Sequence, residues 1–254
     1  MRSVAAISAF FLSVFSAAAG ADPAPREAAY ALYAAGDYEG AVGAAKAAGG
    51  ADNLAFAARA LNAEAYFAED RKEARRTAGR AVDAAQEALE DDPGKIEAHL
   101  QAAIGYALRG ANMGSARVFL TNLPARARRH IDAALALDPD NPWALSTSAA
   151  WRLEVYRRGG GSIYGANPDE GYREFIKARA LAPDNMTIAY ECALRLIASG
   201  RDEWRKFALD CLRAARGGAP HTDFERRIKA RADALARAYR DGPEAVAAFV
   251  KTQP

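Results

Sequence analysis

Residues 89–93 read LEDDP, residues 137–141 read LDPDN and residues 181–185 read LAPDN, and each of these stretches follows an Ala-rich segment. Proline cannot continue a helix, so each stretch marks a helix end. The three prolines are 46 and 44 residues apart along the chain. Such a period predicts a solenoid of stacked helix pairs, in which each pair buries its apolar face against its neighbours.

The segments between these ends have helical periodicity. Ala127, Ile131, Ala134 and Leu135, for example, fall on one face of a helix. Alternating strand patterns are nearly absent, and 65 of the 254 residues are Ala, which loses no side-chain entropy in a helix. The fold class predicted for the chain is therefore all-α.

Small residues recur inside these segments in a pattern that resembles the tetratricopeptide (TPR) repeat. Residues 36–38 (GDY) have the form of its turn between helices, and Ala134 and Ala178 stand where it places small side chains. Small residues let two helices approach closely. The resemblance spans about residues 26–215 and implies a right-handed TPR-like solenoid of antiparallel helix pairs. We expect the C-terminal helices after residue 220 to cap its end.

Two insertions depart from the usual TPR period of about 34 residues. They are Gly110–Pro124 and Arg158–Pro168, each between the two helices of one repeat. With the stretch ALALDPDNPWAL at residues 134–145, this arrangement resembles the periplasmic T component of tripartite (TRAP) solute transporters. It also resembles the related regulator-of-microtubule-dynamics proteins. The first of these resemblances implies an auxiliary role in solute uptake.

The first residues have the composition of a signal peptide. Arg2 precedes an apolar run from Val4 to Phe15, and Ala19–Ala21 forms a cleavage pattern. We therefore expect residues 1–21 to be a signal peptide and residues 22–254 to form the TPR-like domain, in the periplasm or secreted. No later stretch is apolar enough to span a membrane, so no span is expected after cleavage.

Composition and motifs argue against nucleic-acid binding and against catalysis. The formal net charge of +2 gives no bulk attraction to nucleic acid. His99, His130 and His221 form no HExxH motif, and neither a GxSxG elbow nor a phosphate-binding loop occurs. The sequence therefore predicts a protein that is not an enzyme and that holds no cofactor and no metal.

In TPR proteins the first helix of each repeat lines a concave groove, and this resemblance supplies candidate binding residues. They are Glu97, Leu100, Ile104, Trp143, Ser146, Ala150, Tyr190 and Leu194. The alternative for the two aromatic residues is packing between repeats. Both insertions should emerge on one edge of the stack, where insertions often bind partners. The candidates at this edge are Arg117, Arg158 and Tyr164, and the alternative is a solvated surface.

Two cysteines, Cys192 and Cys211, are predicted on the antiparallel helices of the last repeat, on either side of a turn near residues 199–202. Their heights along the helices differ by roughly 3 Å, which is compatible with a disulfide. The alternative is a pair of small buried side chains in the repeat core.

Together these features predict an exported, non-enzymatic scaffold that binds a protein, a peptide or a small ligand in its concave groove. Two other functions stay open: an enzyme acting on cell-wall material with the solenoid as its cleft, and a structural protein that self-associates as a homo-oligomer. Two carboxylates facing each other across a pocket would favour the enzyme. A continuous apolar groove without perturbed acids would favour the scaffold.

Overall fold

The Ala-rich segments fold as helices. A computed structural model describes residues 27–253, and the predicted signal peptide, residues 1–21, lies outside the described residues. The helices are α1 (Glu27–Ala35), α2 (Tyr38–Ala48), α3 (Ala51–Phe67), α4 (Arg71–Asp91), α5 (Ile96–Ala111), α6 (Ser115–Thr121), α7 (Leu123–Leu137), α8 (Pro142–Arg157), α9 (Gly161–Tyr164), α10 (Pro168–Leu181), α11 (Met186–Ser199), α12 (Arg205–Gly217), α13 (Asp223–Asp241) and α14 (Pro243–Lys251), with a short 3₁₀ turn at Asp202–Trp204.

The repeated proline motifs end one helix and begin the next. After Pro139, the Asn141 side chain accepts hydrogen bonds from the backbone N–H groups of Trp143 and Ala144, both at 3.1 Å. Asn185 caps α11 in the same way. An asparagine at this position satisfies N–H groups that have no partner inside the helix. The motif therefore makes a short turn between two antiparallel helices.

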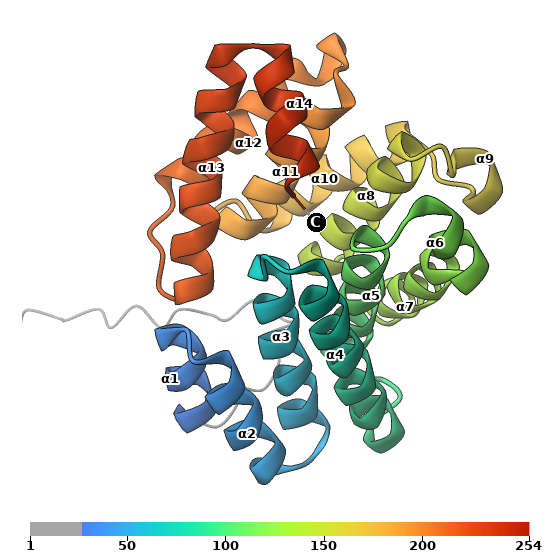
Figure 1. Cartoon of the computed structure of the whole chain (residues 1–254), viewed down its shortest axis with the longest axis vertical. Helices are drawn as coiled ribbons and strands as arrows, with labels where there is room; N and C mark the ends of the chain where they lie inside the picture. The colour runs from blue at the N-terminus through green and yellow to red at the C-terminus, as the bar shows by residue number, and fades with distance from the viewer. Residues whose placement is uncertain (1–26, 254) are drawn as a thin grey trace, which may run out of the picture.

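Neighbouring helices pack as antiparallel pairs, and the pairs stack on one another (Figure 1). The pairs are α1 with α2, α3 with α4, α5 with α7, α8 with α10, α11 with α12, and α13 with α14. The two insertions form the short helices α6 and α9 between the members of their pairs. This arrangement confirms the predicted all-α, TPR-like solenoid of helix pairs.

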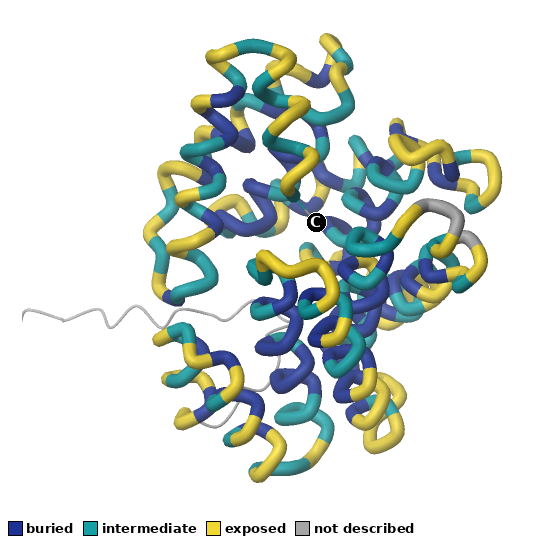
Figure 2. The backbone as a smooth tube through the Cα atoms, in the orientation of Figure 1, coloured by how far each residue is buried: buried dark blue, intermediate teal, exposed yellow. Residues whose placement is uncertain are grey.

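The core is built largely from alanine. Ala134 and Ala178 are fully buried, and so are many other alanines. Figure 2 shows the buried segments in dark blue along the helices. Larger side chains collect in the last repeats, where Phe175, Tyr190 and Leu194 pack in one cluster. Alanine side chains between closely spaced helices, together with a few large side chains, therefore fill the interior.

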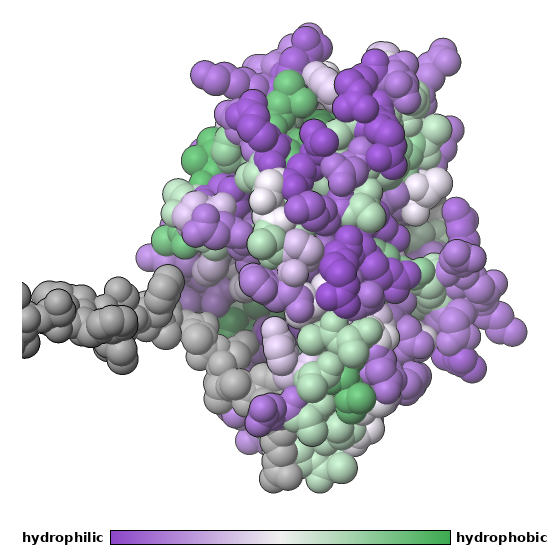
Figure 3. All heavy atoms as spheres, turned by 90° about the vertical axis from the view of Figure 1, so that its left-hand side faces the viewer, coloured by the Kyte–Doolittle hydropathy of each residue, from purple (hydrophilic) through white to green (hydrophobic). Residues whose placement is uncertain are grey.

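The two C-terminal helices cap the last repeat, as predicted, but α13 also reaches the first repeats. Tyr38 Oη donates a hydrogen bond of 3.0 Å to Asp223 Oδ2, and Phe224 packs against Tyr66 and Phe67. Figure 3 shows this side of the molecule: its upper part is mainly hydrophilic, and hydrophobic residues gather toward its lower end. The contacts of α13 turn an open solenoid into a nearly closed ring.

Candidate binding cavity

The concave side of the solenoid forms a cavity of about 400 Å³ that is partly open to solvent. The first helices of successive pairs line it, together with α7 and the start of α13, which completes one side of its wall. The main lining residues are Arg59, Asn62 and Tyr66 of α3, Glu97, Leu100, Gln101, Ile104 and Leu108 of α5, Trp143, Ser146, Ala150 and Glu154 of α8, Thr187, Glu191 and Arg195 of α11, and Thr222, Phe224 and Glu225 at the start of α13.

One part of the cavity wall is apolar. Leu100 and Ile104 lie on α5, and Ile131 and Trp151 are contributed by α7 and α8. The indole nitrogen of Trp151 donates a hydrogen bond of 3.0 Å to the carbonyl oxygen of Pro124, which fixes the ring at the start of α7. Since the polar atom of Trp151 is already paired, the ring offers an apolar surface to the cavity.

Another part of the wall carries ion pairs. Arg59 Nη2 lies 2.7 Å from Glu97 Oε1, and Gln101 Nε2 donates to the same oxygen at 2.7 Å. Asn62 Nδ2 in turn donates to Gln101 Oε1 at 2.9 Å. This network ties α3 to α5 and holds the buried Glu97 carboxylate in a fixed orientation.

A second ionic network joins α3, α8 and α11. Tyr66 Oη donates a 2.8 Å hydrogen bond to Glu191 Oε1, and Arg195 lies 3.2 Å from Glu191 and 3.4 Å from Glu154. Burial raises the pKa of Glu154, but Arg195, Arg157 and Arg158 together lower it to about 2. Glu154 therefore stays ionised at neutral pH and does not serve as a proton donor.

Six of the eight predicted groove residues line this cavity, and the edge residue Arg158 lines it too. The six are Glu97, Leu100, Ile104, Trp143, Ser146 and Ala150. Trp143 is 42% exposed, so its ring is open to solvent at the rim. On α5 and α8, the residues that line the cavity are therefore the ones that the repeat pattern places on the concave side.

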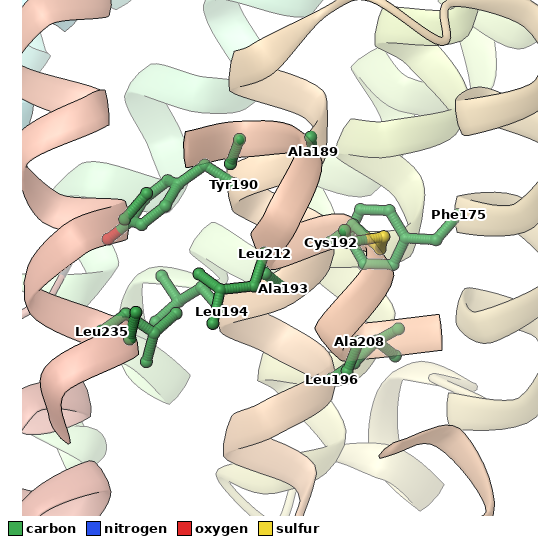
Figure 4. Packing of buried hydrophobic residues seen from close by; sticks show 14 of the residues in the cluster. Phe175, Ala189, Tyr190, Cys192, Ala193, Leu194, Leu196, Ala208, Leu212 and Leu235 are labelled. Atoms are coloured by element: carbon green, nitrogen blue, oxygen red, sulfur yellow. A yellow bond between two sulfur atoms is a disulfide. The ribbon is translucent and has the colours of Figure 1, made fainter. Parts of the chain in front are cut away.

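Tyr190 and Leu194 do not line the cavity, and this prediction was wrong. Both are fully buried, and Figure 4 shows them on the side of α11 that faces Leu235 of α13. Tyr190 Oη also donates to Gln253 Oε1 at 3.1 Å. Because α13 and α14 cover that side, α11 presents Thr187, Glu191 and Arg195 to the cavity instead.

The two remaining edge candidates lie outside the cavity lining. Arg117 is exposed on α6. Tyr164 is half-buried and packs against the cluster that contains Trp151 and Leu123. The insertion that carries Arg117 nevertheless contributes Val118 to the cavity wall. The edge and the cavity are therefore adjacent.

The structure joins the Sγ atoms of Cys192 and Cys211 in a disulfide, with the two Cα atoms 6.0 Å apart. Cys192 lies on α11 and Cys211 on α12, and both are buried beside Phe175 and Ala208. The bond ties together the two helices of the last repeat.

The sequence analysis did not identify several of the residues that line the cavity. Glu191 and Arg195 are spaced four residues apart, as groove residues on one helix would be, but one position away from the predicted pair. Phe224 and Glu225 reach the cavity only because α13 folds back onto α3. No local pattern marks that long-range contact.

Within residues 27–253, no helix combines the length and the apolar character needed to cross a bilayer. In the same part of the chain, no three His, Cys, Asp or Glu side chains gather closely enough to hold a metal ion.

Helix pairs stacked around a concave cavity define a TPR-like helical repeat protein. The crystal structure of a thermophilic TPR protein from Thermus thermophilus is similar, with a TM-score of 0.58. The two chains are 17% identical, and the similarity covers 82% of this chain and 96% of the other. This likeness confirms the fold.

Residues 44–240 match the family described as regulator of microtubule dynamics protein 1-3. The chain belongs to this family, which confirms the second resemblance noted from the two insertions. No curated protein sequence matches the chain.

Proposed function

We propose that this protein is a non-enzymatic scaffold whose cavity holds a short protein segment, a peptide or a small ligand. The observation that carries the proposal is the cavity of about 400 Å³ that opens to solvent on the concave side. Ligand sites in proteins commonly measure about 300–1,000 Å³ and combine an apolar wall with a few fixed polar groups. A whole folded domain is too large for this space.

Binding is favoured over catalysis by the state of the carboxylates around the cavity. Glu97 is paired with Arg59, Glu191 with Arg195, and Glu154 with three guanidinium groups. A general acid needs a carboxyl group that keeps its proton near neutral pH. The guanidinium groups around Glu154 favour its charged form instead, so this part of the cavity suits recognition of a polar end of a ligand better than proton transfer.

A variant that fills the cavity tests this proposal. Ala107 of α5 lines the cavity and is exposed, so Ala107→Trp should be tolerated and should occupy the space. Ala136→Trp places the same side chain on the exposed face of α7 and serves as the control. The probe is a naphthalene sulfonate dye that fluoresces in apolar sites, and the dye fluorescence is the readout. We expect Ala107→Trp to weaken dye binding by about tenfold and Ala136→Trp to leave it unchanged. Equal dye binding by both variants would refute the cavity as the ligand site.

We also propose that the protein is exported and that it assists solute uptake. The signal-peptide pattern and the resemblance to the transporter T component support this role, and a buried disulfide suits an oxidising compartment. Mass spectrometry of the periplasmic protein should find its first residue at Asp22. Intact residues 1–21 on that material would contradict cleavage, and transporter genes beside this gene would support the uptake role.

A further inference from the structure

The two inserted helices lie on one edge of the molecule. Figure 1 shows α6 and α9 together on the right-hand side, away from α13. Met113, just before α6, and Tyr164, at the end of α9, pack against the same cluster around Trp151. The two insertions are therefore neighbours, and we call them the insertion edge, defined by residues 110–124 and 158–168.

Large apolar side chains stand out into solvent along this edge. Leu120 of α6 is 87% exposed and Ile163 of α9 is 65% exposed. Tyr156, at the end of α8 next to α9, is half exposed. Two aliphatic side chains on two short helices make separate points of contact. Such an arrangement suits insertion into the surface of a lipid bilayer better than docking on a flat protein face.

The same edge carries positive charge. From Ala98 to Ile131 the chain contains five Arg and neither Asp nor Glu. Arg109 lies in the last turn of α5, Arg117 in α6 and Arg126 in the first turn of α7, so all three are close to the first insertion. Among the described residues, none of these three forms an ion pair. A chain with a net charge of only +2 therefore concentrates uncompensated charge here.

We propose that the insertion edge docks on an anionic phospholipid bilayer. Leu120 and Ile163 would enter the boundary between head groups and acyl chains, while the three arginines pair with lipid phosphates. Guanidinium groups bind phosphate with two parallel hydrogen bonds, and basic residues near an anionic leaflet add attraction. This docking is independent of what occupies the cavity, so either proposal can fail alone.

The test is sedimentation of the full chain with phosphatidylcholine vesicles, with and without phosphatidylglycerol. The variant Leu120→Ser/Ile163→Ser removes both apolar tips. Its matched control is Leu137→Ser/Leu181→Ser, because these exposed leucines end α7 and α10, the helices that follow the two insertions. The unmodified chain, the tip variant and the control all carry residues 1–21, so any membrane affinity of those residues is common to the three proteins. We expect the tip variant to bind anionic vesicles about tenfold more weakly and the control to bind like the unmodified chain.

Charge is tested with Arg117→Glu, for which exposed Lys206→Glu on α12 is the control. We expect Arg117→Glu to weaken binding to anionic vesicles by about fivefold or more, and added salt to weaken binding of the unmodified chain. Three results would overturn the proposal: equal effects of tip and control variants, equal binding to vesicles without phosphatidylglycerol, and binding to polyglutamate but not to vesicles. The last result would identify an acidic protein partner instead.

Discussion

Single small residues set how closely the helices of this solenoid approach. A Cβ atom added at Gly105 of α5 would lie 2.8 Å from Val82 Cγ2 and 3.1 Å from the carbonyl oxygen of Ala78. Backbone oxygen cannot move aside without disturbing α4. Gly79 of α4, in contrast, would place its Cβ in open space. The same residue type thus permits close packing at one site and is replaceable at the other.

We expect Gly105→Ala to lower the free energy of unfolding by about 1–3 kcal/mol through overpacking. Gly79→Ala is the matched control, and it should be neutral or stabilising by up to about 1 kcal/mol because Ala has the higher helix propensity. Urea unfolding of both variants measures the difference. Equal stability of the two would mean that α4 and α5 are less closely packed than the structure indicates.

Two histidines form a hydrogen-bonded pair between α5 and α7. His99 Nδ1 lies 3.1 Å from His130 Nδ1, and His99 Nε2 lies 3.1 Å from the carbonyl oxygen of Pro93. A carbonyl oxygen only accepts, so His99 Nε2 carries the hydrogen, and in the neutral pair His130 Nδ1 is the donor. Burial, and then the nearby His99 and Arg129, lower the pKa of His130 to about 4.

This lowered pKa predicts a pH dependence of stability. Between pH 6.5, the ordinary histidine pKa, and about 4, the unfolded chain binds a proton at His130 that the folded chain does not. The free energy of unfolding should therefore decrease as the pH is lowered from 6.5 to about 4, by about 1–2 kcal/mol once solvent screening is allowed for. His130→Gln should remove this part of the slope, and the exposed His221→Gln should not. An unchanged slope in His130→Gln would contradict the assignment.

At the scale of elements, the insertions and the disulfide distinguish these repeats from a plain helix pair. Cys192 and Cys211 are 19 positions apart in the sequence, and the chain between them includes the turn between α11 and α12. Closing this loop covalently restricts the unfolded chain, which favours the folded state. The last repeat is also where α13 and α14 pack, so its stability supports the closure of the whole ring.

We expect Cys192→Ala/Cys211→Ala to lower the free energy of unfolding by about 3 kcal/mol. Reductant should lower the stability of the unmodified protein similarly and leave the double variant unchanged, which provides the control. Thiol labelling of the unfolded, unreduced protein should detect no free thiol. Two labelled thiols per chain would contradict the disulfide.

At the scale of the whole molecule, the start of α13 adds one side to the wall of the concave cavity. Besides the contacts of Phe224, the Arg227 guanidinium lies 4.0 Å from the centre of the Phe67 ring, and Arg226 Nη2 donates to the Ala34 carbonyl oxygen at 3.1 Å. These contacts join the last elements of the chain to α1 and α3. Loss of them should loosen the first repeat, which otherwise packs on one side alone.

We expect Phe224→Ala to destabilise the closure by about 2 kcal/mol and to speed hydrogen exchange in α1, α2 and the end of α3. Phe249→Ala removes a half-buried ring from α14 and is the control, because its effect should stay in the last repeat. Hydrogen exchange read by mass spectrometry separates the two. Protection of α1 that survives in Phe224→Ala would show that the ring stays closed without this contact.

Local sequence determined the helices, their ends and their pairing. Prolines and asparagines act on the next few residues, and small residues at fixed spacing act on an adjacent helix, so both signals can be read along the chain. The same register correctly places Glu97, Leu100 and Trp143 on the concave side.

Only the tertiary structure decided which side of α11 faces the cavity and that α13 forms part of the cavity wall. Tyr190 is buried and Glu191 lines the cavity because α13 packs against α11 while its first residues contact α3. Phe224 and Tyr66 are far apart in sequence, and their contact depends on the summed curvature of all the intervening helix pairs. Small rotations at each pair add up along a solenoid, and no single repeat encodes their total.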